Sequence, residues 1–181
     1  MVYVFLAEGF EEIEALTPVD YLRRAGIDVC TVGVTGKTVK GARGVPVVCD
    51  ITEHEFCPDE ALEAVVLPGG IPGVPNLEKS QVVPAALEFA CRNGKTLAAI
   101  CAAPTLLAKY GYLERKNAVC YPGMESQLCG AHYTDQNVVR DGHIITARAA
   151  GVSELFAFEL IRALRSAEAA ETVRKAVCAR P

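Results

Sequence analysis

Residues 95–111 of the chain read KTLAAICAAPTLLAKYG, and two different patterns meet in this stretch at Cys101. Residues 96–100 are apolar and follow a polar turn, which is typical of a short buried strand. After the cysteine come small residues and then Pro104, a residue favoured in the first turn of a helix. The stretch therefore predicts a strand, a tight turn that contains Cys101, and a helix.

Strand-like and helix-like segments alternate on both sides of this stretch. Further strands are expected at 2–7, 28–34, 63–70 and 117–123, further helices at 11–26, 80–95 and 153–177, and hairpins at 36–52 and 136–151. Strands that are apolar throughout are covered on both faces, and repeated strand–helix units form mainly parallel sheets. The pattern predicts an α/β fold in which helices lie on both sides of such a sheet.

Length and composition indicate one well-packed domain. A chain of 181 residues with 51% hydrophobic residues is expected to form a single domain over residues 1–181. The formal net charge of −4 gives no basic surface for nucleic acid or an anionic membrane. No apolar stretch approaches the ~20 residues of a membrane span. We therefore expect no nucleic-acid partner and no membrane association.

The cysteines indicate a reducing compartment. Eight are present, none of them in a C-x-x-C pair, and the short apolar start of the chain lacks the basic residues of a secretory signal. Free thiols in a cytoplasmic protein are therefore expected. Cysteines and histidines show none of the usual zinc spacings, so we expect no metal.

Three candidate residues fall where parallel strands end, which is where such sheets bind ligands. Glu14 follows the first strand, Gly70 is the last residue of the strand-like segment at 63–70, and Cys101 follows the strand at 96–100. A thiol at a strand-to-helix turn lies near free N–H groups and the positive end of a helix dipole, and both lower its pKa. Cysteine is also a common small core residue. The pattern alone leaves both interpretations of Cys101 open.

The other candidates also have two interpretations. Gly70 could offer its N–H to an oxyanion, or it could belong to an ordinary turn. Glu14 could be a partly buried proton donor, or a solvated acid that favours the start of its helix. His132 could act as a base beside the sulfur, or lie free in a loop.

Together these segments are more specific than any one of them. AICAAPTLLA at 99–108 resembles the nucleophile elbow of the ThiJ/PfpI superfamily, the class I glutamine-amidotransferase-like proteins. The segments at 8–29, 65–70 and 141–161 resemble its first strand–helix unit, its glycine loop and its closing hairpin and helix. Within it, the E-E-x-E motif and Ala102 are similar to the DJ-one branch. The resemblance implies a flavodoxin-like fold: a mainly parallel sheet sandwiched by helices, with an edge β-hairpin.

The resemblance also implies roles for individual residues. Cys101 is expected to be a peroxide-sensitive nucleophile and Glu14 a protonated carboxyl hydrogen-bonded to it. The N–H groups of Gly70 and Ala102 are expected to form the oxyanion site, and His132 matches the histidine-bearing segment of the branch. Proteins of this branch usually form homodimers, and Arg23, Arg24 and Arg43 are expected to lie near that interface. One departure is Ala149-Ala150-Gly151, where the family commonly has Gly-Pro-Gly.

The implied function is that of a cofactor-independent cysteine enzyme acting on reactive carbonyls. Such an enzyme resembles glyoxalase III or a protein deglycase, takes a small aldehyde or a glycated adduct, and is linked to the oxidative stress response. A redox-sensing stress chaperone with an oxidisable cysteine is the alternative. A cysteine peptidase is the weaker one, because position 102 lacks the histidine that peptidase-like members carry.

Overall fold

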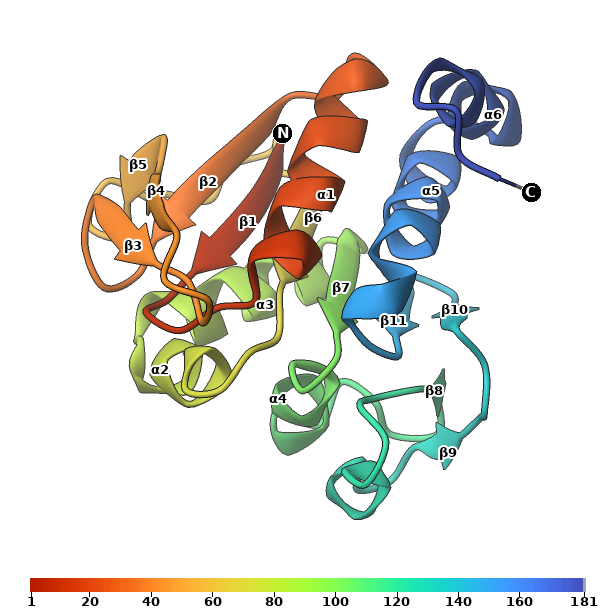
Figure 1. The fold of residues 1–181 in the computed structure, drawn as a ribbon. Coiled ribbons are helices and arrows are strands. Elements are labelled where there is room, and N and C mark those ends of the chain that lie inside the picture. The colour runs from red at the N-terminus through yellow and green to blue at the C-terminus, as the bar shows by residue number, and fades with distance from the viewer. Residues whose placement is uncertain (181) are drawn as a thin grey trace.

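A seven-stranded sheet forms the centre of the molecule in the computed structural model, which describes residues 1–180 (Figure 1). Its strands are β1 (Val2–Leu6), β2 (Val29–Gly33), β5 (Ile51–Thr52), β6 (Ala64–Leu67), β7 (Thr96–Ile100), β10 (Val138–Asp141) and β11 (Ile144–Ala147). They lie in the order β10-β11-β7-β6-β1-β2-β5. All neighbours are parallel except β10 and β11, which form an antiparallel hairpin at one edge.

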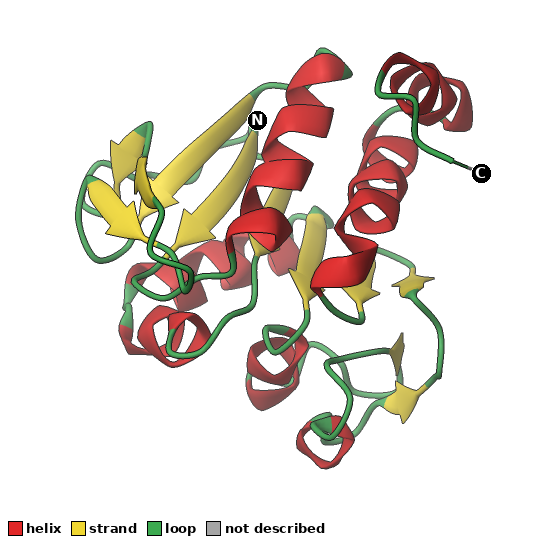
Figure 2. Cartoon of the chain, in the orientation of Figure 1, coloured by secondary structure: helices red, strands yellow, loops and turns green. Residues whose placement is uncertain are grey.

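Helices cover both faces of the sheet (Figure 2). One face carries α1 (Glu12–Arg24) and α5 (Ser153–Leu164), with α6 (Ala167–Ala176) packed on α5; the other carries α2 (Gly73–Lys79), α3 (Val82–Arg92) and α4 (Pro104–Lys109). Short 3-10 turns are η1 (Glu125–Gln127) and η2 (Ala150–Val152). No helix within residues 1–180 has the length and apolar character needed to cross a membrane.

The central strand β1 shows why its sequence is apolar throughout. Alternate side chains of a strand point to opposite faces. Val4 and Leu6 pack into the core beneath α1 and α5, whereas Phe5 and the following Ala7 pack into the core beneath α2, α3 and α4. All four are fully buried. The expected α/β sandwich is confirmed.

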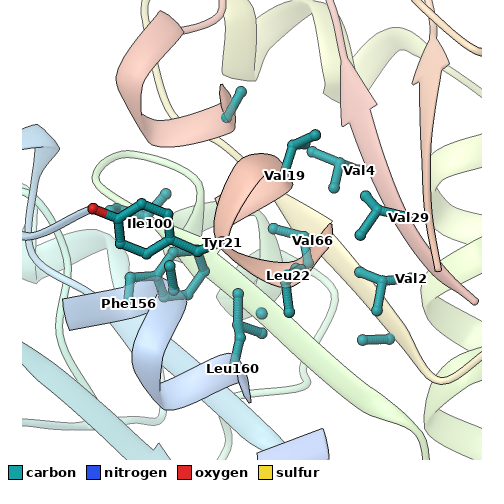
Figure 3. Packing of buried hydrophobic residues seen from close by; sticks show 14 of the residues in the cluster. Val2, Val4, Val19, Tyr21, Leu22, Val29, Val66, Ile100, Phe156 and Leu160 are labelled. Carbon is teal, nitrogen blue, oxygen red and sulfur yellow. The ribbon is translucent and has the colours of Figure 1, made fainter. Parts of the chain in front are cut away.

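The core beneath α1 and α5 is shown in Figure 3. Leu22 of α1 and Leu160 of α5 approach each other above Val66 of the sheet, and all three are completely buried. Burial of a leucine side chain contributes about 1.5–3 kcal/mol. This packing fixes α1 against the sheet, and α1 carries Glu14.

The two expected hairpins are both present, but the first one does not join the central sheet. Strands β3 (Thr38–Lys40) and β4 (Pro46–Val48) pair with each other as a separate two-stranded sheet. Pro46 lacks a backbone N–H, so this strand has one donor fewer for pairing. The edge of the central sheet is formed instead by β5, which pairs with β2.

The order of the long parallel strands defines where a ligand crevice forms. Across the sheet these strands lie in the order β2-β1-β6-β7-β11. Numbered by their position in the chain, this is the order 2-1-3-4-5, which is that of flavodoxin. The chain leaves β1 on one side to form β2 and returns on its other side to form β6. The crevice of such a sheet lies at the carboxyl ends of the strands beside this reversal. Glu14, Gly69 and Gly70 follow β1 and β6, and Cys101 follows the adjacent β7.

Candidate active site

Cys101 occupies a strained turn between β7 and α4. Its φ angle is 66°, a left-handed conformation that is uncommon for a residue other than glycine. Two backbone hydrogen bonds hold it there: its N–H donates to the Ala147 carbonyl at 2.9 Å, and its carbonyl accepts from the Tyr121 N–H at 2.7 Å. The turn presents a half-buried sulfur at the start of α4, as the sequence predicts for a nucleophile elbow.

Glu14 lies against this sulfur. The side chain is completely buried, its Oε2 accepts the Gly69 N–H at 2.9 Å, and the carboxyl lies beside the Cys101 thiol, close enough to influence its pKa. Its Oε1 is buried and has no hydrogen-bond partner within residues 1–180. A carboxyl oxygen in that setting is suited to share a proton with the sulfur.

Gly69 makes the approach of these two groups possible. A Cβ at this position would lie 2.6 Å from Glu14 Oε2 and 2.7 Å from the Cys101 Cβ. Both distances are shorter than any van der Waals contact, so a side chain here would force the carboxyl and the thiol apart. The glycine is therefore required by the site and not only by the turn.

Gly70 and Ala102 complete the surroundings of the sulfur. The backbone N–H groups of both residues lie near Cys101 and lower the pKa of its thiol. Gly70 has a φ angle of 101°, and a Cβ there would lie 2.4 Å from the Gly9 carbonyl oxygen. Two backbone N–H groups beside one nucleophile are what an oxyanion site requires, so that role of Gly70 and Ala102 stays a prediction.

The Glu14–Cys101 pair holds a proton more tightly than either group does in water. Burial raises the pKa of Glu14 to about 7. Burial, followed by the charge of Glu14 and its hydrogen bond, raises the pKa of Cys101 to about 12, against the lowering influence of the Ala102 and Gly70 N–H groups. The elbow alone predicts a lowered thiol pKa, but burial of the thiol and then the neighbouring Glu14 raise it instead. When Glu14 carries the proton, its charge no longer opposes the thiolate.

An open pocket of about 320 Å³ leads to the sulfur. Besides Cys101, Gly70 and Ala102, it is lined by Glu11, Ala42, Arg43, Ile71, Tyr121 and Met124. Arg43 pairs with Glu11 at 3.3 Å on one side. Ile71 and Tyr121 are exposed apolar side chains on the rim.

Sequence reasoning missed Tyr121 as a pocket residue. It lies within the short strand expected at 117–123, which has no pattern that marks a ligand-binding residue. His132 was the candidate from the part of the chain that follows the cysteine helix.

The structure places His132 elsewhere. It is exposed in β9 (His132–Tyr133), which pairs with β8 (Asn117–Ala118), and its N–H donates to the Lys116 carbonyl at 2.8 Å. It is not among the residues that line the Cys101 pocket.

Other residues singled out in the sequence also lie outside this pocket. Residues 149–151 lead into the η2 turn, with Ala149 extended. Arg23 pairs with Asp50 and Arg24 with Asp20, so both arginines have partners within the chain. Within residues 1–180, no group of three or more His, Cys, Asp or Glu side chains is arranged to hold a metal ion.

Residues 1–163 match the DJ-1/PfpI family. The chain belongs to this family. It is 38% identical to Protein dj-1beta of Drosophila melanogaster over 175 residues, which cover 95% of this chain and 93% of that protein. It is 29% identical to the glutathione-independent glyoxalase DJR-1.2 of Caenorhabditis elegans over 172 residues, covering 94% and 91%.

Solved DJ-1 structures share the whole fold. The crystal structure of Drosophila melanogaster DJ-1beta matches with a TM-score of 0.94 and 37% identity, covering 99% of this chain and 98% of that one. An oxidised Toxoplasma gondii DJ-1 matches with a TM-score of 0.90 and 32% identity, covering 98% and 97%. The family recognised from the sequence is confirmed, and a DJ-1-type function follows from it.

The raised pKa of Glu14 predicts a specific pH dependence of stability in this DJ-1/PfpI chain. The ordinary pKa of 4.5 applies to the unfolded chain, so between pH 4.5 and about 7 the folded state binds the extra proton. The stabilisation is complete below pH 4.5 and is lost as the pH rises through about 7, a loss of about 3 kcal/mol. We expect the free energy of unfolding of the wild type to fall by about this amount relative to Glu14→Gln between about pH 4 and pH 8. Urea unfolding of both proteins measures it, and parallel pH curves would contradict the assigned burial.

Proposed function

We propose that the protein is a glutathione-independent, cofactor-independent glyoxalase in which Cys101 is the nucleophile and Glu14 carries the proton. One observation carries the proposal: a fully buried carboxyl lies beside the thiol of a strained turn, and the N–H groups of Gly70 and Ala102 lie near the same sulfur. A 2-oxoaldehyde such as methylglyoxal is the substrate. The name of the Caenorhabditis elegans relative supports this choice.

The first step is addition of the sulfur to the aldehyde. In the reactive form, Glu14 carries the proton and Cys101 is a thiolate. The sulfur forms a bond to the aldehyde carbon, and the electron pair of the carbonyl π bond moves to oxygen. The N–H groups of Gly70 and Ala102 stabilise this oxygen until Glu14 protonates it. The product is a hemithioacetal on Cys101.

Proton transfer then converts the hemithioacetal to a 2-hydroxy acid. Glu14, now ionised, removes the hydrogen on the former aldehyde carbon and returns it to the neighbouring carbon, while the hydroxyl proton passes from the first oxygen to the second. This gives a thioester. Water adds to it, Glu14 takes a proton from the water, and the thiolate leaves. Methylglyoxal and water thus become lactic acid, and both side chains return to their starting state.

Lactate formation from methylglyoxal in the absence of glutathione tests the proposal. Proton NMR follows the appearance of the lactate methyl signal. Lactate that forms no faster than in buffer would refute the assigned reaction. Early glycated adducts contain the same reactive carbonyl carbon, so the proposal extends to protein deglycation.

Tyr121 is expected to position the substrate. Its backbone is anchored to the Cys101 carbonyl, and its side chain forms part of the pocket wall. Tyr121→Ala should raise the KM for a 2-oxoaldehyde with a large apolar substituent about tenfold, since burial of apolar area is lost, with a smaller change in kcat. The matched control is Tyr133→Ala in β9. Equal loss in both variants would contradict a contact specific to Tyr121.

Oxidation of Cys101 is the second candidate function. A carboxyl and two N–H groups around one sulfur are suited to hold the oxygens of a sulfinate, and an oxidised DJ-1 structure is among the relatives. Hydrogen peroxide oxidises the thiolate to a sulfenate with release of water, and a second peroxide gives the sulfinate. Mass spectrometry after limited peroxide should find Cys101 oxidised ahead of the exposed Cys57 and Cys178. Uniform oxidation of all eight cysteines would oppose a sensor role.

The proposal also includes the state of the protein in the cell. Each chain forms one domain, two chains form a homodimer, and the dimer lies in the cytoplasm. Ile13, Val45, Val48 and Ile71 are exposed on α1, the β3–β4 hairpin and the loop after β6, and a second copy would cover such apolar side chains. All eight cysteines are free thiols, as expected in a reducing compartment.

A further inference from the structure

A second cavity of about 250 Å³ lies at the opposite end of the sheet from Cys101. It forms where β7 and β11 begin, and the Leu97 N–H donates to the His143 carbonyl at 2.9 Å to hold these two starts together. At ~3.3 Å per residue, β7 separates Lys95 from Cys101 by roughly 20 Å. The cavity is therefore independent of the site described above.

The interior of this cavity is mainly apolar. Leu97 and Ile144 are buried side chains that form its base, and the ring of Tyr112 provides a wall. Gly94 and Gly111 are at its border, where an added Cβ would meet no atom within 4 Å. An apolar or aromatic group of small size fits such a space without displacing the chain.

The polar side chains at the cavity give it a positive character. Lys95, Lys116 and His143 lie around it, with Asp141 as the single acid among the lining residues. Asp141 is already engaged by Lys116 at 3.2 Å and by the Asn117 N–H at 2.9 Å. The Lys95 ammonium donates to the Glu60 carbonyl at 3.1 Å, a neutral group that leaves its charge uncompensated. Lys95 is therefore the lysine of this cavity without an acidic partner among the residues that the structure describes, and its charge favours an anionic ligand.

We propose that this cavity binds a small carboxylate with an apolar or aromatic body. The body packs on Leu97, Ile144 and Tyr112, and the carboxylate faces Lys95, while Lys116 neutralises Asp141, the acid that would otherwise repel it. The combination of apolar base and a few convergent polar groups is typical of small-molecule sites. The proposal does not depend on the reaction at Cys101.

Cys91 provides the reporter for the test. Its exposed thiol lines the cavity, whereas the exposed thiols of Cys57 and Cys178 do not. The wild-type protein is treated with iodoacetamide at increasing concentrations of benzoate, and alkylation of each cysteine is followed by peptide mass spectrometry. At a benzoate concentration ten times its Kd, alkylation of Cys91 should slow about tenfold, with Cys57 and Cys178 unchanged. Benzyl alcohol, which has the same ring without a charge, should protect Cys91 much less.

Matched lysine variants test the charge. Lys95→Met and Lys116→Met should each weaken protection by benzoate severalfold, while Lys79→Met, a surface lysine of α2, should leave it unchanged. Three results would each overturn the proposal: no protection of Cys91, equal slowing at Cys57 and Cys178, or equal protection by benzyl alcohol. Retained benzoate protection in both cavity lysine variants would equally remove the assigned role of the cations.

Discussion

Replacement of Cys101 by serine is expected to lower the rate of lactate formation from methylglyoxal by about 10⁴-fold or more, to near the uncatalysed rate. Serine keeps the approximate size of the side chain and the strained turn, but its hydroxyl is a much weaker nucleophile than a thiolate. The two N–H donors and the Glu14 carboxyl remain in place. The fall in the rate of lactate formation would therefore be caused by the missing sulfur and not by a change in the shape of the pocket. Initial rates measured by proton NMR give the comparison.

The matched control is Cys178→Ser, which removes an exposed thiol far along the chain. Its rate should equal that of the wild type. Urea unfolding of Cys101→Ser confirms that the variant is folded under the assay conditions. Equal rates for Cys101→Ser and wild type would exclude Cys101 from the reaction, and the proposed function with it.

Replacement of Glu14 by glutamine is expected to lower kcat by about 10²–10⁴-fold, the usual contribution of a general acid–base group. The amide has the same shape and still accepts the Gly69 N–H, but it carries no transferable proton and no charge. Because the charge and the hydrogen bond of Glu14 both raise the pKa of Cys101, removal of the carboxylate should lower it. Thiolate absorbance during a pH titration measures this pKa in both proteins.

Asp20→Asn is the control for this substitution, since it neutralises an exposed acid on the same helix. It should change neither kcat nor the Cys101 pKa. Unchanged kcat in Glu14→Gln would remove Glu14 from proton transfer. An unchanged Cys101 pKa in the same variant would show that the two groups are not coupled, and the shared-proton arrangement would have to be abandoned.

Patterns in the sequence predict the sheet, the helices and the edge at which the site forms. β1, β6 and β7 are buried on both faces and are therefore apolar throughout, and each ends in residues that break the strand. Because parallel strands end at one edge of a sheet, the sequence predicts that Glu14, Gly70 and Cys101 lie close to one another. Ligands bind at the carboxyl ends of the strands in open α/β sheets. The alternation of strands and helices in the sequence predicts such a sheet, and with it the edge at which the site lies.

Other features could not be predicted because they depend on contacts between distant segments. Tyr121 reaches the pocket through one backbone hydrogen bond to Cys101, and no local pattern encodes that bond. The β3–β4 hairpin forms its own sheet because β5 occupies the edge position beside β2. The raised pKa of the thiol depends first on the burial of Cys101 itself and then on the nearby carboxyl of Glu14. Glu14 lies in the first turn of a helix, where acidic residues are common, so the sequence does not indicate that its side chain is buried.

The left-handed turn at Cys101 has a consequence for how the protein can evolve. A residue other than glycine in that conformation costs about 1–3 kcal/mol, and glycine would adopt it without strain. Selection for folding alone would therefore tend to replace the cysteine. If Cys101 is the nucleophile proposed above, its left-handed backbone is a stability–activity trade-off, in which the thiol serves the reaction at a cost in folding stability.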